Sequence, residues 1–266
     1  MSKTKYITAL LLGDVVGHPG GRALFVGLPQ LIKEYRADVV VLNGENAVDG
    51  FGLSEQLGRI FFSYGVHVIT SGNHIWQKEE LRPYLESESR LLRPANYPPK
   101  SPGKGSTIVD LGWTKVGVLN LQGRHNMLPI DCPFQVGMAQ IEKLRKQTPI
   151  ILVDFHAELE QEKEAMGFYL DGKASVVVGT HTHVQTLDEK ILPQGTAYIT
   201  DMGMCGPLEG VIGSQPEISI QRQLTQIPLR NVIVDAPSHL QGVVCTIDSS
   251  SGKALSITRF SRSFGV

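Results

Sequence analysis

The sequence predicts an α/β protein with a parallel sheet. Strand-like and helix-like segments alternate in its N-terminal part, which is typical of parallel strands joined by right-handed helical crossovers. In addition, five apolar segments each end in residues that can bind metal ions. Because ligands bind beyond the carboxyl ends of the strands in open α/β sheets, these observations together predict one polar site at one edge of the sheet.

The N-terminal part begins with three strands and two helices in alternation. Ile7–Leu12 is apolar and partly β-branched, as expected of a buried strand. Gly21–Tyr35 carries apolar residues at helical spacing, and Val39–Leu42 is a second strand. Ser54 is a suitable N-cap for the next helix, and Val66–Thr70 follows as the third strand.

The middle of the chain changes character. Arg93–Gly105 is rich in proline and glycine and is predicted to be a long surface loop. Thr107–Leu111 and Lys115–Leu121 then have the pattern of two hairpin strands that turn at Gly112. We expect the chain to pass to a second sheet layer here.

Helices and strands alternate again after this hairpin. A helix is expected from Phe134 to Lys146, followed by the strand Ile150–Val153. A helix over Leu159–Tyr169 then leads to the strand Ser175–Val178. The C-terminal part is expected to be rich in strands, with little helix. Its strand-like segments are Thr196–Ile199, Gly242–Ile247 and Leu255–Phe260.

Length and composition indicate one folded unit. The chain has 266 residues, of which 41% are hydrophobic and 19% are charged, which is ordinary usage for a globular protein with one sizeable core. No linker or internal repeat divides the sequence. We therefore expect a single domain over residues 1–266.

Charge and hydrophobicity exclude several classes of partner. The formal net charge of −1 creates no overall field that would attract DNA, RNA or an acidic membrane. No apolar run approaches the roughly 20 residues that a membrane helix needs, and Met1–Lys5 leads directly into a strand-like segment. We expect a cytoplasmic protein that acts on a small molecule, without membrane contact or stable nucleic-acid binding. The proline-rich segment and the strand-rich C-terminus are compatible with a homo-oligomer.

The three cysteines are predicted to be reduced thiols. Cys132, Cys205 and Cys245 are widely spaced and form no Cys-x-x-Cys pair, so neither a disulfide framework nor a thiolate zinc site is expected. Cys205 lies beside a glycine-rich turn near the predicted site, which leaves it a candidate for a local role.

Seven residues beyond the apolar segments form the predicted metal site. They supply carboxylate oxygens, amide oxygens and imidazole nitrogens, a mixture that suits Fe, Mn or Zn better than Ca or a structural cysteine-zinc site. Seven ligands exceed what a single tetrahedral ion takes, whereas a bridging carboxylate can hold two ions about 3.5–4 Å apart. The predicted ligands are Asp14, Glu45, Asn46, Asn73, His156, His181 and His183.

Local sequence supports several of these ligands. Alternate side chains of the segment 179–183 point to the same face, so His181 and His183 can reach neighbouring ions. Glu45 follows a central strand and a glycine that permits a tight turn, and it is the best candidate for the bridging carboxylate.

The other histidines receive different interpretations. The strand before His156 favours a ligand over a structural residue, and Asp154 is a candidate for orienting its ring. His18 follows the first strand closely and can rim the site. His67 and His125 are interpreted as structural or surface residues.

His74 is predicted to be the general acid of a hydrolytic reaction. It directly follows Asn73, so an Asn73 side chain bound to metal would let the imidazole point past the ion toward a leaving group. An imidazole can carry the required proton at working pH.

These motifs closely resemble the calcineurin-like metallophosphoesterases and, within them, the YmdB-like branch of bacterial phosphodiesterases. The resemblance runs from Tyr6 to beyond Gly242. Where the wider superfamily has Asp-x-His and Gly-Asp, this chain has Asp14-Val15-Val16 and Gly44-Glu45, and both departures agree with the YmdB-like pattern. The motifs that carry the resemblance are Gly13-Asp14, Gly44-Glu45-Asn46, Gly72-Asn73-His74 and Gly179-Thr180-His181-Thr182-His183.

The resemblance implies a four-layer α/β/β/α sandwich of the metallophosphoesterase type. It also implies two divalent or trivalent metal ions, Fe or Mn, with 2′,3′-cyclic nucleotides as substrates and His74 as proton donor. The implied ligands of one ion are Asp14, Glu45, Asn46 and His183, and those of the other are Glu45, Asn73, His156 and His181.

The resulting hypothesis is a dinuclear phosphodiesterase. A metal-bound hydroxide would attack phosphorus in line while His74 protonates the departing ribose oxygen. Two alternatives remain at this point. An amidohydrolase barrel also uses a His-x-His pair, although this chain lacks eight clear βα units. A regulatory or signalling protein could keep the metal site with weak or different phosphoesterase activity.

Overall fold

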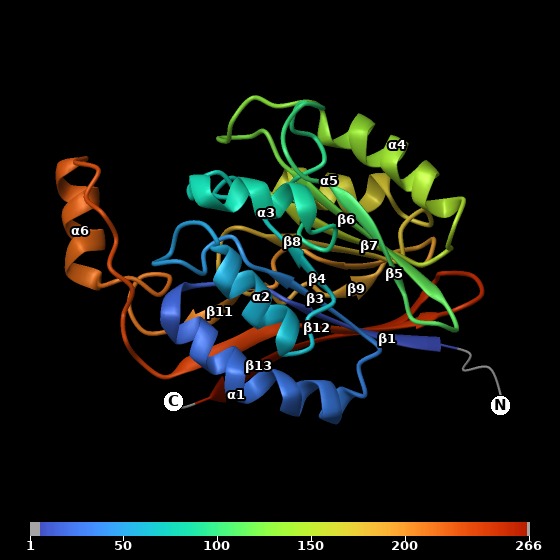
Figure 1. Ribbon diagram of the computed structural model, residues 1–266, viewed down its shortest axis with the longest axis horizontal. Helices are drawn as coiled ribbons and strands as arrows, with labels where there is room; N and C mark the ends of the chain where they lie inside the picture. The colour runs from blue at the N-terminus through green and yellow to red at the C-terminus, as the bar shows by residue number, and fades with distance from the viewer. Residues whose placement is uncertain (1–5, 265–266) are drawn as a thin grey trace.

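Two sheets packed face to face, with helices on both outer faces, form the four-layer α/β/β/α sandwich that the sequence and its resemblance predict (Figure 1). The computed structural model describes residues 6–264. Two open sheets also exclude the amidohydrolase barrel, which requires a closed ring of strands. The residues Met1–Lys5, expected to lead into the first strand, lie outside the described residues.

The first sheet combines parallel and antiparallel strands. Its order is β2-β11-β12-β1-β3-β4, with β13 paired to β12. The neighbours β1, β3 and β4 are parallel, as the βαβαβ pattern predicts. The strands of this sheet are β1 (Tyr6–Leu12), β2 (Asp14–Val15), β3 (Val39–Asn43), β4 (Val68–Thr70), β11 (Met204–Pro207), β12 (Ser238–Asp248) and β13 (Ala254–Phe264).

The second sheet begins with the predicted hairpin. Strands β5 and β6 pair antiparallel, and β6, β7, β8 and β10 then run parallel. The order is β5-β6-β7-β8-β10-β9, so the expected passage to a second layer is confirmed. The strands are β5 (Ser106–Asp110), β6 (Lys115–Gln122), β7 (Ile151–His156), β8 (Val176–Thr180), β9 (Lys190–Ile191) and β10 (Ala197–Ile199).

The helices divide between the two outer faces. α1, α2 and α3 cover the first sheet, and α4 and α5 cover the second (Figure 1). The Ser54 hydroxyl accepts a hydrogen bond from the backbone N–H of Leu57 at 3.3 Å, as predicted for the N-cap of α2. The helices are α1 (Gly17–Tyr35), α2 (Glu55–Ser63), α3 (Arg82–Ser87), α4 (Pro133–Arg145), α5 (Glu160–Tyr169) and α6 (Pro216–Thr225), with a 3-10 turn at Glu79–Leu81.

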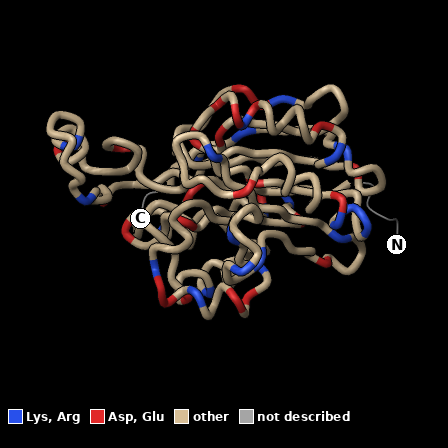
Figure 2. Tube along the Cα trace, turned by 90° about the horizontal axis from the view of Figure 1, so that it is seen from above, with Lys and Arg blue, Asp and Glu red and all other residues tan. Residues whose placement is uncertain are grey.

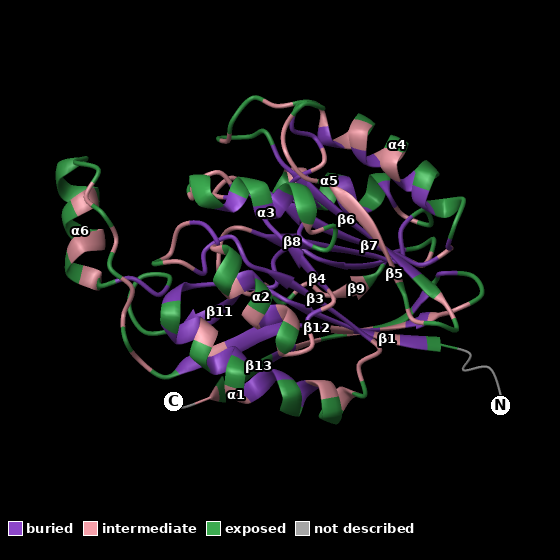
Figure 3. Ribbon diagram, in the orientation of Figure 1, coloured by how far each residue is buried: buried purple, intermediate pink, exposed green. Residues whose placement is uncertain are grey.

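Strand β1 is apolar throughout because both of its faces are buried. Leu10 and Leu12 pack under α1 and α2, whereas Ile7 and Leu11 face the second sheet. Side chains alternate between the two faces of a strand, so a central strand between two packed layers must be apolar at every position. The buried residues accordingly lie at the centre of the sandwich (Figure 3).

Helix α6 is a feature that the sequence interpretation did not anticipate. The C-terminal part was expected to contain little helix, yet a ten-residue helix interrupts it between β11 and β12. No residue of α6 is buried, and the helix projects from the body of the protein (Figures 1 and 3). Because no residue of α6 is buried, the apolar residues of this helix do not belong to the core.

The surface carries charges of both signs. Basic and acidic residues are interspersed along the trace (Figure 2), in keeping with the formal net charge of −1. Among residues 6–264, no helix combines the length and the apolar character required to span a bilayer.

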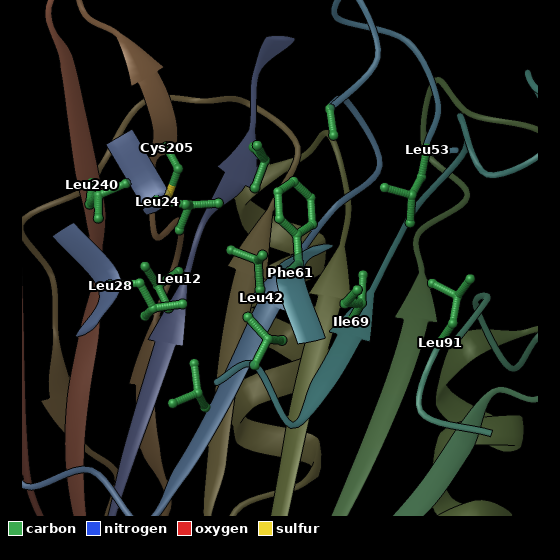
Figure 4. Packing of buried hydrophobic residues seen from close by; sticks show 14 of the residues in the cluster. Leu12, Leu24, Leu28, Leu42, Leu53, Phe61, Ile69, Leu91, Cys205 and Leu240 are labelled. Carbon is green, nitrogen blue, oxygen red and sulfur yellow. The ribbon is translucent and has the colours of Figure 1, made fainter. Parts of the chain in front are cut away.

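Truncating the core residue Phe61 should strongly destabilise the fold. Phe61 of α2 is 1% exposed and packs in a cluster with Leu42 and Ile69 (Figure 4). Phe61→Ala is expected to lower the free energy of unfolding by about 3–5 kcal/mol, because the cavity adds to the lost burial. Urea unfolding would measure this loss. Phe168→Ala is the matched control, since Phe168 is 54% exposed. Equal losses in the two variants would contradict the assigned core.

Candidate metal centre

The predicted ligands converge where the carboxyl ends of parallel strands from both sheets meet. Glu45 and Asn46 follow β3, and Asn73 and His74 follow β4. His156 is the last residue of β7, and the His-x-His pair follows β8 in the second sheet. Asp14 begins β2, directly after the turn that ends β1. A site at the strand ends therefore draws its residues from two sheets, because the sheets pack with these edges together.

His156 Nε2 is the centre of one group of ligand atoms. It lies 3.1 Å from Glu45 Oε1, 3.1 Å from Asn73 Oδ1 and 3.0 Å from His181 Nδ1. Atoms of Glu45, His156 and His181 all lie within 4.8 Å of one another. These four residues are the set that the resemblance implies for one ion.

Asn46 links a second group of atoms to the first. Its Nδ2 lies 3.1 Å from Glu45 Oε1 and 3.0 Å from His183 Nε2. Asp14 contacts the first group, since its Oδ2 accepts the backbone N–H of His181 at 3.2 Å and its Oδ1 lies 3.8 Å from His156 Nδ1. Glu45 thus lies between the two groups, as a bridging carboxylate would.

Two buried polar atoms of this region have no hydrogen-bond partner among the described residues. They are Asp14 Oδ1 and His183 Nδ1. Buried polar groups are normally satisfied, so each exception calls for an explanation. The set of carboxylate, amide and imidazole donors fits transition metals that accept both oxygen and nitrogen ligands. The residues present therefore fit a metal centre.

Burial and mutual charge shift the ionisation of these side chains. Burial raises the pKa of the Asp14 carboxyl well above its ordinary value. Burial alone would also raise the pKa of Glu45, but the adjacent His156 holds it well below its ordinary range. Burial alone would lower the pKa of His156, but the Glu45 carboxylate raises it to about 9. Burial and the nearby His156 lower the pKa of His181 to about 3. The lowered pKa keeps Glu45 a carboxylate although it is buried, and a buried carboxylate attracts a cation.

Thr180 and Asp154 orient the ring of His156. The Thr180 hydroxyl donates to Asp154 Oδ1 at 2.8 Å, so its oxygen can accept the Nδ1–H of His156 at 2.9 Å. The Asp154 carboxylate also accepts a hydrogen bond from Asn43 at 3.1 Å. Asp154 therefore acts on His156 through Thr180, whereas the sequence interpretation had it orient the ring directly. The arrangement leaves Nε2 of His156 facing the other ligands.

A buried ion pair supports the turn between the two histidines after β8. His181 and His183 have positive φ angles of 104° and 64°, which are strained for residues other than glycine. The Asp201 carboxylate accepts the backbone N–H and the hydroxyl of Thr182 at 3.1 and 2.8 Å. Lys163 Nζ binds the same carboxylate at 2.7 Å, and both charged residues are 1% exposed. These contacts hold both imidazoles toward the site.

Three supporting residues were missed from the sequence. Glu158 Oε2 lies 2.8 Å from His181 Nε2, and Glu158 lines the ligand cavity. Asp201, which follows β10, and Lys163 of α5 support the turn. Glu158 lies only two residues after His156 in the sequence, and this short spacing could have indicated that it belongs to the site. Lys163 and Asp201 lie far from the histidines in sequence and share no spacing with them.

Glu45, Asn46, His74, His181 and His183 line a common cavity of about 300 Å³. The backbone N–H of His74 donates to Glu45 Oε2 at 3.1 Å, and its Nδ1 lies 2.7 Å from Asn46 Oδ1. An amide oxygen only accepts hydrogen bonds, so the Nδ1 atom of His74 carries the proton that Asn46 Oδ1 accepts. The other ring nitrogen of His74, Nε2, takes no part in this hydrogen bond.

The remaining candidates lie elsewhere. His18 lines an adjoining cavity beside α1 and does not line the ligand cavity. His67 and His125 lie outside the lining of the ligand cavity as well. Cys205 is buried, which raises the pKa of its thiol to about 12, so it is not a thiolate ligand.

Comparisons with known proteins identify the family. Residues 10–260 match the family model described as YmdB-like protein. The chain belongs to the YmdB-like family. It is 45% identical over 250 residues to the 2′,3′-cyclic-nucleotide 2′-phosphodiesterase of Bacillus subtilis, covering 94% of this chain and 95% of that protein. This family membership confirms the sequence-based expectation of a YmdB-like phosphodiesterase.

Solved structures of similar proteins share the fold. A structure described as a novel phosphatase from Mycoplasma pneumoniae superposes with a TM-score of 0.91 at 35% identity, covering 98% of this chain and 94% of that one. A hypothetical protein from Thermus thermophilus superposes with a TM-score of 0.89 at 37% identity, covering 97% and 99% of the two chains. The four-layer sandwich is thus common to these proteins.

Replacing Gly72 should weaken metal binding. A Cβ atom at Gly72 would lie 2.2 Å from His156 Nε2 and 2.4 Å from Glu45 Oε2, too close for these side chains to keep their positions. Gly72→Ala is expected to weaken metal affinity at least about ten-fold, as displaced ligands do. Metal titration with elemental analysis would measure the change. Gly21→Ala is the control because a Cβ atom there meets nothing within 4 Å. Unchanged affinity in Gly72→Ala would contradict the ligand positions.

Proposed function

We propose that this protein is a dinuclear metal-dependent phosphodiesterase that hydrolyses 2′,3′-cyclic nucleotides. The class of enzyme follows from family membership and from the Bacillus subtilis relative, which covers nearly the whole chain. The observation that carries the proposal is the convergence of carboxylate, amide and imidazole groups around His156 Nε2 and Asn46, beside a cavity that Glu45, Asn46, His181 and His183 line.

The seven predicted ligands would hold two ions. Glu45, Asn73, His156 and His181 would hold one ion, and Glu45, Asn46, Asp14 and His183 would hold the other. We propose Fe or Mn, because the donor set mixes nitrogen and oxygen without thiolates. Bound ions would supply Lewis acidity toward the phosphate oxygens and an activated water molecule.

His74 would supply the proton for the leaving group. Its ring is held at Nδ1 by Asn46 Oδ1, and its face packs edge-on against Phe51 at a centroid distance of 5.0 Å. These two contacts restrict the His74 ring and leave its Nε2 atom to donate a proton to the leaving group. In the reaction a bond forms between the water oxygen and phosphorus while the bond from phosphorus to O2′ breaks. The Nε2 proton of His74 passes to O2′, and the product is a nucleoside 3′-monophosphate.

Glu158 would assist this chemistry by orienting His181. Its carboxylate binds His181 Nε2 and leaves Nδ1 toward His156 and Glu45. A carboxylate behind a ligand histidine fixes the ring and raises its basicity. The chain thus provides both the proposed ligands and the contacts that hold them in place.

Removal of metal should abolish the activity. Purified protein loaded with Mn²⁺ is expected to convert 2′,3′-cyclic AMP to adenosine 3′-monophosphate, and a chelator should stop the reaction until metal is returned. Chromatography of the products would follow both the rate and the choice of bond. Full turnover by protein that elemental analysis shows to be free of metal would contradict the proposal.

Loss of the His74 imidazole should slow the chemical step. His74→Ala is expected to lower kcat on 2′,3′-cyclic AMP by about 10²- to 10⁴-fold, the usual contribution of general acid catalysis. The loss should be much smaller on bis(p-nitrophenyl) phosphate, whose leaving group needs no proton. Metal content should stay the same, since the backbone contact to Glu45 is kept.

His125→Ala is the matched control for this experiment, because His125 is exposed and lies outside the ligand cavity. An equal fall of His74→Ala on both substrates would refute the role of proton donor. It would leave the metal-dependent reaction itself unaffected.

A further inference from the structure

Residues 208–237 form an arm between β11 and β12. The outer part of the arm is α6, which projects from the body of the protein (Figure 1). Leu224 of α6 is 80% exposed and Ile220 is 54% exposed. The inner part of the arm, its root, returns to the body beside the ligand cavity. The root consists of residues 211–215 and 230–235.

Contacts on two sides fix the root to the body. Ile233 fits against two glycines: a Cβ atom on Gly17 would lie 3.2 Å from its side chain, and one on Gly50 would lie 3.0 Å away. Ion pairs join Arg230 to Asp49 and Arg22 to Asp235. The root is therefore held in place although α6 beyond it has no buried residue.

The two halves of the root also pair with each other. The backbone N–H of Val234 donates to Gly213 at 2.9 Å, and that of Gln215 donates to Val232 at 2.8 Å. Such pairing gives the root a defined shape before any ligand binds.

The root and Phe51 form the apolar side of the ligand cavity. Ile212, Asn231 and Ile233 line the same cavity of about 300 Å³ as His74 and four of the proposed ligands. These four are Glu45, Asn46, His181 and His183. Phe51 is continuous with this side and touches the His74 ring. The cavity is thus lined both by polar residues suited to phosphate and by apolar residues.

Asn231 and Ser214 are the polar residues of the root in this cavity, and α6 orients Asn231. Arg222 of α6 donates from Nη1 to Asn231 Oδ1 at 2.7 Å. Within the described residues, no hydrogen bond occupies the amide nitrogen of Asn231. Because its oxygen is already engaged by Arg222, Asn231 presents a hydrogen-bond donor to a ligand in the cavity.

We propose that Phe51 and the arm root form the subsite for the nucleobase. This inference rests on the proposed function, which places the cyclic phosphate at the metal ligands. Phe51, Ile212 and Ile233 would contact the faces of the planar base, and the amide of Asn231 would donate to a ring nitrogen or carbonyl oxygen. Every common nucleobase carries such an acceptor, so the subsite favours nucleotides over base-free phosphodiesters without demanding one base. Arg222 is a positioning residue that acts through Asn231.

The test compares two substrates of the metal-loaded protein. One is 2′,3′-cyclic AMP, and the other is methyl riboside 2′,3′-cyclic phosphate, which has the same phosphodiester but no base. Wild type is expected to show at least about ten-fold higher kcat/KM on the nucleotide. In Asn231→Asp, which keeps the shape and the Arg222 contact but replaces the donor with an acceptor, the ratio between the substrates should fall about 5- to 100-fold.

Two further variants separate the subsite from general damage. Arg222→Ala should lower the ratio by less than Asn231→Asp, and through KM rather than kcat. Leu224→Ala, on the outer part of the same helix, should leave the ratio unchanged. Thermal unfolding of all variants would verify that they fold.

The outcomes distinguish the two proposals. Equal kcat/KM of wild type on both substrates, or an unchanged ratio in Asn231→Asp, would overturn the subsite while the phosphodiesterase activity stands. Turnover of neither substrate by metal-loaded wild type would overturn the proposed function and the subsite with it. A fall in the ratio for Leu224→Ala as large as that for Asn231→Asp would also refute the assignment to the root.

Discussion

The contact between Glu45 and His156 is the interaction on which the site depends. Glu45 extends from the first sheet and His156 from the second, and both side chains are fully buried at a separation of 3.1 Å. Removing one charge of such a pair leaves the other uncompensated, which is costly at a buried position. The geometry of the ligand cluster therefore depends on how the two sheets pack, because neither sheet alone supplies both side chains.

Hydrogen bonds from neighbouring residues hold the side chains around this pair in position. Two of the proposed ligands and the turn beside them are held by neighbouring polar groups: His156 by Thr180, His181 by Glu158, and the turn between the two histidines by Asp201. The polar groups behind the ligands are themselves satisfied, as in the hydrogen bond from Asn43 to Asp154. Such preorganisation costs folding stability in strain and burial, and it lets the site bind a charged ligand without rearranging.

The arm of residues 208–237 differs from the site because only its root is closely packed. Its root is fixed by close contacts with Gly17 and Gly50, whereas α6 gains nothing from burial. A helix of ten residues is marginal in water by itself, so its retention in this chain calls for another reason. The contact from Arg222 to Asn231 provides one, since it connects the helix to the cavity in which the chemistry is proposed.

The sequence alone determined the layered fold and the identity of the ligand candidates. Strand and helix periods are local, and parallel strands bring their carboxyl ends together by geometry, so separate motifs such as Gly44-Glu45-Asn46 and Gly179-Thr180-His181-Thr182-His183 could be assigned to one site. Only the tertiary structure decided what surrounds them. The route from Asp154 through Thr180 to His156, the Lys163–Asp201 pair and the seat of Ile233 on Gly17 depend on contacts between residues with no fixed spacing. Helix α6 was not predicted from the sequence, and only the tertiary structure shows that it projects with no buried residue.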